Sequence, residues 1–205
     1  MSEPVLSIAR FNGVLEVARP DGARLPIYAI GIRPHAPGLL VGRANGFSAE
    51  LYEPWLYELA QRFCVIAWDA RGHGGSSWPE GPLEDVFSVD RLADDLAAGT
   101  AAAQMSLHGA PLHFAGHSPA GVESAVFAAH RDADTWQRLP QVRHRLHLVG
   151  GDPAAEDRSW VSVSLASVSR QLPAADLVVV PNTGHLMVFQ RPDACRGVIF
   201  QRLTD

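Results

Sequence analysis

One stretch, residues 112–121, restricts the possible folds of this chain more than any other. It reads LHFAGHSPAG, an apolar run typical of a buried strand followed by a serine, a proline and small residues that suit a helix start. A strand that turns sharply at a serine into a helix has the layout of a nucleophile elbow, which exposes the hydroxyl beside backbone N–H groups. We therefore predict that Ser118 is the centre of a site.

The elbow pattern G-x-S-x-G is met in part. Gly116 and Ser118 fit it, whereas Ala120 stands at the last glycine and Gly121 follows one place later. The purely structural alternative is a strand-to-helix turn with Ser118 as helix N-cap and Pro119 at the first helical position, where proline is favoured. The rest of the chain decides between these interpretations.

Hydrophobic patterning predicts an α/β fold. Short β-rich runs at 5–9, 13–18 and 25–32, with turn signals between them, favour an antiparallel N-terminal edge. Strands and helices then alternate, which favours a mostly parallel sheet with helices on both faces. The strands are expected at 39–42, 64–68, 112–116, 146–150 and 177–181, and the helices at 48–62, 89–106, 118–130, 160–171 and from His185 onward.

Two of these helices have predicted buried faces. Ser48 is expected to cap the helix over 48–62. The apolar positions that should face the core are Leu51, Trp55, Leu56 and Leu59 in that helix, and Leu92 and Leu96 in the helix over 89–106.

Composition excludes several classes of function. The chain has 205 residues, 47% of them hydrophobic, and a formal net charge of −5. This length predicts a single domain over 1–205. Because no basic stripe occurs, nucleic acid and anionic membranes are poor partners, and a small neutral or weakly charged substrate fits better. The sequence does not indicate an oligomeric state.

The chain has the features of a cytoplasmic protein. Its first residues, MSEP, lack a basic region followed by an apolar one, and no apolar run reaches the length of a membrane span. Its two cysteines, Cys64 and Cys195, suggest core packing in a reducing compartment rather than a disulfide framework.

Taken together, the motifs resemble those of the α/β-hydrolase fold family. The resemblance spans nearly the whole chain and keeps the family's order. The segments that carry it are Arg43–Phe47, Asp69–Gly74, Gly116–Ser118, Gly184-His185 and Pro192-Asp193.

The resemblance implies a triad in the chain order Ser, acid, His. Ser118 matches the nucleophile and His185 the base. The acid should follow the strand over 146–150, where Asp152 is the first choice and Asp157 the second, although some members of the family place the acid after the preceding strand. Either aspartate could instead be a turn residue or a helix cap. No cofactor or metal is implied, and the scattered histidines show no metal-ligand spacing.

The loop over 43–47 is implied to hold the oxyanion of the reaction. The backbone N–H of Asn45 is the expected donor, helped by its side chain, and Phe47 is expected near an apolar pocket together with Trp78 and Trp55, the last of which fits core packing better. We interpret four other motif residues as structural, with the first two tying their loop together by charge-assisted hydrogen bonds: Asp69, Arg71, His73 and His117.

Pro119 departs from the family pattern. One oxyanion donor in this fold is the backbone N–H of the residue after the nucleophile, and proline has none. Loss of one such donor costs about 2.7–4 kcal/mol of transition-state stabilisation. Arg43-Ala44 also stands where relatives usually carry His-Gly.

Length is a second departure. Between the predicted elbow helix and the strand at 146, relatives usually hold a further strand and often a lid, but residues 131–140 are polar and show no strand pattern. We therefore expect one strand and a lid to be missing, either in a minimal lidless form or because a segment near 131–141 is omitted. The second explanation is favoured, since a gap in the middle of a sheet is costly.

The sequence thus predicts a hydrolase that acts on a small ester, lactone or thioester through a Ser-His-Asp triad and an acyl-enzyme. The alternative is a non-hydrolytic member of the family, either a lyase or cyclase that works by proton transfer or a ligand-binding scaffold, because Pro119 removes an oxyanion donor.

Overall fold

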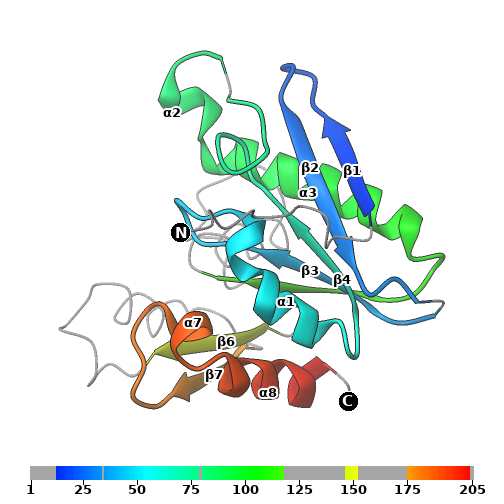
Figure 1. The fold of residues 1–205 in the computed structure, drawn as a ribbon. Helices are drawn as coiled ribbons and strands as arrows, with labels where there is room; N and C mark the ends of the chain where they lie inside the picture. Colours follow the sequence, from blue (N-terminus) through cyan, green and yellow to red (C-terminus); the bar gives the residue numbers. More distant parts are fainter. Residues whose placement is uncertain (1–12, 34, 79, 118–145, 152–174, 204–205) are drawn as a thin grey trace, which may run out of the picture. The chain divides into compact units, whose positions relative to one another are not determined.

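The computed structural model describes residues 13–33, 35–78, 80–117, 146–151 and 175–203 (Figure 1). They fall into two compact units, one up to Glu123 and one from Ser124 onward, and each unit is described by itself. The predicted single domain over 1–205 and the omitted segment near 131–141 stay predictions, the latter because that segment lies outside the described residues.

The first unit contains a five-stranded sheet in the order β1-β2-β4-β3-β5. Strands β1 (Gly13–Ala18) and β2 (Arg24–Ile30) form an antiparallel hairpin, whose turn includes Gly22 with φ of +82°. Strand β2 also pairs antiparallel with β4 (Cys64–Trp68). The predicted antiparallel N-terminal edge is therefore confirmed over these residues.

The remaining pairs of this sheet are parallel. Strand β3 (Gly38–Gly42) lies between β4 and β5 (Leu112–Gly116), and every residue of β3 and β4 is buried, as expected for apolar strands covered on both faces. The register pairs Gly42 with Gly116, so β3 and β5 end together. The loops that follow these two strands therefore begin at the same edge of the sheet, where open α/β sheets bind their ligands.

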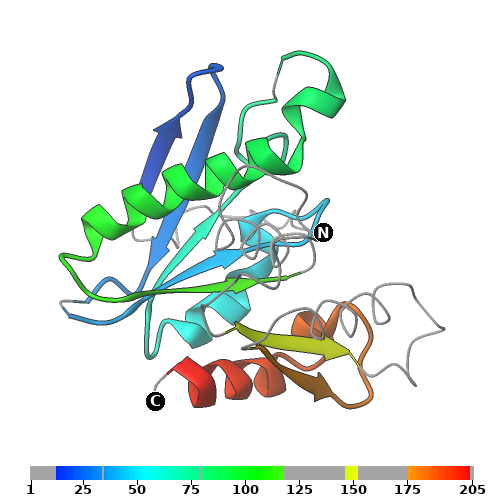
Figure 2. The ribbon, with the colours of Figure 1, turned by 180° about the vertical axis from the view of Figure 1, so that it is seen from behind.

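Helices cover both faces of the sheet. Figures 1 and 2 view the molecule from opposite sides, with α1 (Glu53–Leu59) in front of the sheet in the first view and α3 (Val89–Ser106) in front in the second. The short helix α2 (Leu83–Val86) precedes α3. Helix α3 has its predicted bounds and buries Leu96, whereas Leu92 is only half-buried.

The prediction for Leu51 is wrong. Its side chain is 54% exposed, because the predicted helix over 48–62 starts with the 3₁₀-helix η2 (Ala49–Tyr52) and becomes α-helical only at Glu53. A 3₁₀ turn places residues three apart on one face. The buried stripe accordingly runs through Ala49, Tyr52, Trp55, Leu56 and Leu59.

The start of η2 is held by a residue from another part of the chain. Ser48 occupies the N-cap position without a side-chain cap bond, and the Ala49 N–H donates to Asp69 Oδ1 at 2.7 Å. The buried Asp69 carboxylate also accepts from the Tyr28 hydroxyl at 3.1 Å and the Gly75 N–H at 2.9 Å. A side chain at Gly74 would collide with this carboxylate, and its φ of +50° also favours glycine.

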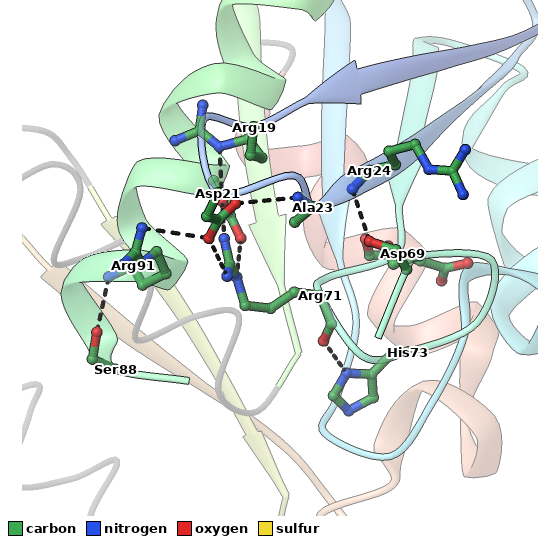
Figure 3. A network of polar contacts seen from close by, with 12 residues as sticks. Arg19, Asp21, Ala23, Arg24, Asp69, Arg71, His73, Ser88 and Arg91 are labelled. Atoms are coloured by element: carbon green, nitrogen blue, oxygen red, sulfur yellow. Dashed lines mark hydrogen bonds and ion pairs between the residues drawn. The ribbon is translucent and has the colours of Figure 1, made fainter. Parts of the chain in front are cut away.

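A buried charged cluster joins the β1–β2 turn, the loop after β4 and helix α3 (Figure 3). Arg71, fully buried, donates to both carboxylate oxygens of Asp95, at 2.6 and 2.8 Å, and to Asp21 at 2.9 Å. Arg19 also donates to Asp95, at 2.9 Å. Asp69 and Arg71 do make charge-assisted hydrogen bonds, but they reach well beyond their own loop.

The second unit contains a parallel pair, β6 (Leu146–Gly151) and β7 (Ala175–Val180), against which helix α8 (Pro192–Leu203) packs. The helix predicted to start at His185 begins later, since α7 spans Met187–Gln190. Both cysteines are free and buried, as predicted, and burial raises the pKa of Cys195 to about 11.

Candidate active site

The carboxyl ends of β3 and β5 lead to the predicted site residues of the first unit. Strand β3 leads into the loop with Asn45 and Phe47, and β5 leads to His117, whose N–H donates to the Gly42 carbonyl at 3.2 Å. Ser118 follows His117 in the sequence and lies outside the described residues. His117, the residue just before the predicted nucleophile, is therefore held beside the end of β3.

The loop after β3 is a tight turn over Ala44–Phe47. The Phe47 N–H donates to the Ala44 carbonyl at 3.2 Å, and Gly46 has φ of +79°, the conformation that a type II turn requires at its third position. The hydrogen bond that closes such a turn joins its first and fourth residues. The N–H of Asn45, the predicted oxyanion donor, therefore takes no part in the hydrogen bond that closes the turn.

The side chain of Asn45 faces His73. Its Oδ1 lies 3.0 Å from His73 Nε2, and His73 Nδ1 lies 2.9 Å from the Arg71 carbonyl. Because a carbonyl oxygen only accepts, Nδ1 carries the hydrogen in that contact. His73 thus connects the loop after β4 to the loop after β3, which is the structural role predicted for it. The Asn45 side-chain amide is engaged with the His73 imidazole, so the backbone N–H is the simpler oxyanion donor.

Tyr52 links the loop after β3 to the residue that follows β5. Its hydroxyl accepts from the Ala44 N–H at 2.9 Å and lies 2.6 Å from Nδ1 of His117. All three residues are buried. His117 is therefore structural, as predicted, while Tyr52 was not a sequence candidate. Nothing in its local pattern distinguishes it from a core residue, because its partners are distant in the sequence.

The aromatic side chains predicted to line a pocket have different surroundings. Phe47 is half-buried and packs edge-on against Tyr52, with ring centroids 6.2 Å apart. Trp55 is buried in the core, in accord with the favoured interpretation. Trp78 is 70% exposed and stacks edge-on with Phe87. Phe47 is thus the one of these three that lies in the loop with Asn45.

His185, the predicted base, belongs to the second unit. Strands β6 and β7 are parallel with Gly151 opposite Val180, so their carboxyl ends lie at one edge. His185 follows β7 and is half-buried in the turn before α7. That turn is closed by Thr183 Oγ1 donating to the Val180 carbonyl at 2.7 Å and by the Gly184 N–H donating to Gln190 Oε1 at 2.8 Å.

Four predicted site residues lie outside the described residues, namely Ser118, Pro119, Asp152 and Asp157. The triad geometry is therefore untested, and these assignments stay predictions. The structure does place Asn45 and His185, each in a loop after the carboxyl end of a parallel strand.

Two kinds of feature are absent from the described part of the chain. Among these residues, no three His, Cys, Asp or Glu side chains are grouped so that they could hold a metal ion. Within the same ranges, no helix has both the length and the apolar character needed to cross a membrane.

Comparison with known proteins identifies the fold. A family model described as serine aminopeptidase, S33, matches residues 43–141, a range that contains Asn45 and Ser118 but not Asp152 or His185. A hydrolase from Pseudomonas aeruginosa PA01 superposes with a TM-score of 0.75 at 18% identity, covering 95% of this chain and 99% of the other. The chain has the α/β-hydrolase fold.

Two further solved structures match this chain to a similar extent. The enol-lactonase from Burkholderia xenovorans LB400 has a TM-score of 0.75 at 17% identity, covering 93% of this chain and 100% of that one. Est1E from Butyrivibrio proteoclasticus, solved with ferulic acid, has a TM-score of 0.73 at 14% identity, with coverage of 93% and 100%. Comparison with curated protein sequences gave no match. At these identities, the structural matches establish the α/β-hydrolase fold and do not define a substrate.

Proposed function

We propose that this α/β-hydrolase-fold protein is a serine hydrolase that transfers the acyl group of a small ester, lactone or thioester. One observation carries the proposal. In each unit, the predicted residues follow the carboxyl ends of paired parallel strands, with Asn45 and Ser118 after β3 and β5, and Asp152 and His185 after β6 and β7. This is the edge at which α/β folds bind ligands. An enol-lactonase and a carboxylesterase among the similar structures agree with this substrate class.

The proposed mechanism proceeds through a covalent intermediate. Ser118 Oγ attacks the acyl carbon while His185 takes the hydroxyl proton, and Asp152, or Asp157 in its place, orients the imidazole. The Asn45 N–H donates to the oxyanion. His185 then gives the proton to the leaving alcohol or thiol, which breaks the ester, and water hydrolyses the acyl-enzyme by the reverse sequence of proton transfers. No cofactor or metal is needed.

A panel of substrates tests this proposal. Release of p-nitrophenol from acetate and butyrate esters, opening of a γ-lactone and release of thiol from a short acyl thioester would be measured with the purified chain. We expect slow, saturable turnover of at least one class, together with a mass increase of the protein equal to one acyl group. Absence of turnover and of an acyl adduct in folded protein would contradict the proposal.

Replacement of Pro119 is predicted to increase turnover. A residue with a backbone N–H at this position supplies the donor that proline lacks, and one oxyanion donor is worth about 10²–10³ in kcat. We expect Pro119→Ala and Pro119→Gly to raise kcat by similar factors. Steady-state ester hydrolysis measures both. A rise in Pro119→Gly alone would indicate added backbone freedom instead of a restored donor.

Pro119 also supports the second candidate function. A lyase or cyclase that moves a proton through Ser118 and His185, or a ligand-binding scaffold, forms no tetrahedral oxyanion and tolerates the missing N–H. If both Pro119 variants fold and neither gains hydrolase activity, this alternative replaces hydrolysis. The same panel of substrates therefore distinguishes the two functions.

A further inference from the structure

We propose that Tyr52 is a positioning residue that fixes the distance between the oxyanion loop, Ala44–Phe47, and the elbow at Ser118. The inference rests on the proposed function, because it assigns Tyr52 to the machinery of that reaction. Tyr52 is the last residue of η2 and belongs to neither loop. Its hydroxyl nevertheless contacts one residue on each side of the site, Ala44 at 2.9 Å and His117 at 2.6 Å.

Each of the two contacted residues stands one position before a residue of the proposed reaction. Ala44 precedes Asn45, the proposed donor, and His117 precedes Ser118, the proposed nucleophile. A single phenol oxygen therefore joins the residues that precede the proposed donor and the proposed nucleophile. The distance between donor and nucleophile must match the distance between the oxyanion and the attacked carbon. A misplacement of about 1 Å in such a site costs about 10²-fold in rate. The His117 N–H, bonded to the Gly42 carbonyl at 3.2 Å, ties the elbow to β3 but does not reach the oxyanion loop.

The positions of the hydrogens favour one assignment of donor and acceptor between Tyr52 and His117. The Tyr52 oxygen accepts the Ala44 N–H, and burial raises the pKa of Tyr52 to about 12, so the phenol keeps its hydrogen at neutral pH. Donation of that hydrogen to Nδ1 makes His117 the tautomer that carries its hydrogen on Nε2. This orientation gives both ends of the linkage a defined donor and acceptor.

Packing keeps the phenol ring in place independently of the hydroxyl. The Tyr52 ring meets Phe47 edge-on at 6.2 Å and the His117 ring at 5.9 Å, and only 2% of the residue is exposed. Phenylalanine retains these ring contacts and loses only the oxygen. Tyr52→Phe is therefore a specific test of the linkage.

We expect Tyr52→Phe to lower kcat about tenfold to a hundredfold and to leave KM unchanged. The matched control is Tyr28→Phe, which removes another buried tyrosine hydroxyl of the same sheet, bonded to Asp69 at 3.1 Å. The control should lose comparable thermal stability and retain kcat. Equal kcat in Tyr52→Phe and wild type, or an equal fall in both variants, would overturn the proposal.

A second pair of variants examines the other end of the linkage. His117→Asn keeps an acceptor near the Nδ1 position, whereas His117→Leu removes it. We expect the asparagine variant to retain more of kcat than the leucine variant, and Tyr52→Phe to reduce kcat no further in the His117→Leu background. Additive effects of the two substitutions would show that Tyr52 and His117 act separately.

Nuclear magnetic resonance of the ¹⁵N-labelled histidines provides a test that does not depend on activity. We expect the His117 imidazole, identified by its loss in His117→Leu, to carry its hydrogen on Nε2 in wild type and to lose that preference in Tyr52→Phe. A hydrogen on Nδ1 in wild type would contradict this assignment of donor and acceptor, and an imidazole that is unchanged in Tyr52→Phe would contradict the linkage. If wild type hydrolyses nothing in the panel, the proposed function fails, whereas an active enzyme indifferent to Tyr52→Phe contradicts the positioning role alone.

Discussion

Ser118→Ala is expected to lower kcat for ester hydrolysis by about 10³- to 10⁴-fold. Loss of the nucleophilic serine or the histidine of a complete triad costs about 10⁶ in kcat. The donor missing at Pro119 has already removed about 10²–10³ of that rate, which leaves the smaller factor. Single-turnover hydrolysis of a p-nitrophenyl ester measures the loss, and Ser106→Ala, at the end of α3, is the matched control.

His185 should act as one unit with Ser118. We expect His185→Ala to cost about as much as Ser118→Ala, and the double variant to be no slower than either, because residues of one catalytic unit are strongly non-additive. Multiplicative losses, or a Ser118→Ala variant that retains full activity, would exclude the proposed triad.

Breaking the Arg71–Asp95 pair is expected to destabilise the fold by about 3–5 kcal/mol, the usual cost of removing one partner of a buried ion pair. Both side chains are fully buried, and the guanidinium also donates to Asp21 at 2.9 Å. We therefore expect Arg71→Met or Asp95→Leu to lower the urea midpoint strongly. The predicted effect is large because the pair links helix α3 to the β1–β2 turn and the loop after β4 (Figure 3).

Two comparisons make this prediction specific. The double variant Arg71→Met/Asp95→Leu should be more stable than either single variant, since it leaves no Arg71 or Asp95 charge unpaired. The exposed pair Arg196–Asp193, at 3.0 Å, should contribute at most about 1 kcal/mol, and Arg196→Ala is therefore the control. Single variants as stable as wild type would contradict the structural role of the cluster.

The regular elements could be predicted because their signals are local. The apolar run of Cys64–Trp68 and the capped helix Val89–Ser106 have the bounds expected from their own residues. The error at Leu51 arose where a 3₁₀ turn replaced an α-helical one, since apolar spacing alone does not distinguish the two within one turn.

The contacts that organise the site could not be predicted, because they join residues distant in the sequence. Asp69 holds the start of η2, twenty residues earlier, and Tyr52 meets His117 across a separation of 65 residues. Asn45 and His185 lie in loops after parallel strands, as expected, whereas Ser118, Pro119, Asp152 and Asp157 stay predictions.

The proposed function depends on the activation of Ser118 by His185, which fluorophosphonate labelling measures. The chain would be treated with a fluorophosphonate, digested, and the adduct mapped by mass spectrometry in wild type and in His185→Ala. This activation predicts one phosphonyl group on Ser118 that forms readily in wild type and at least about 10²-fold more slowly in the variant, as expected for loss of a general base. Folded wild type that remains unlabelled, or labelling of Ser118 that does not depend on His185, would contradict it.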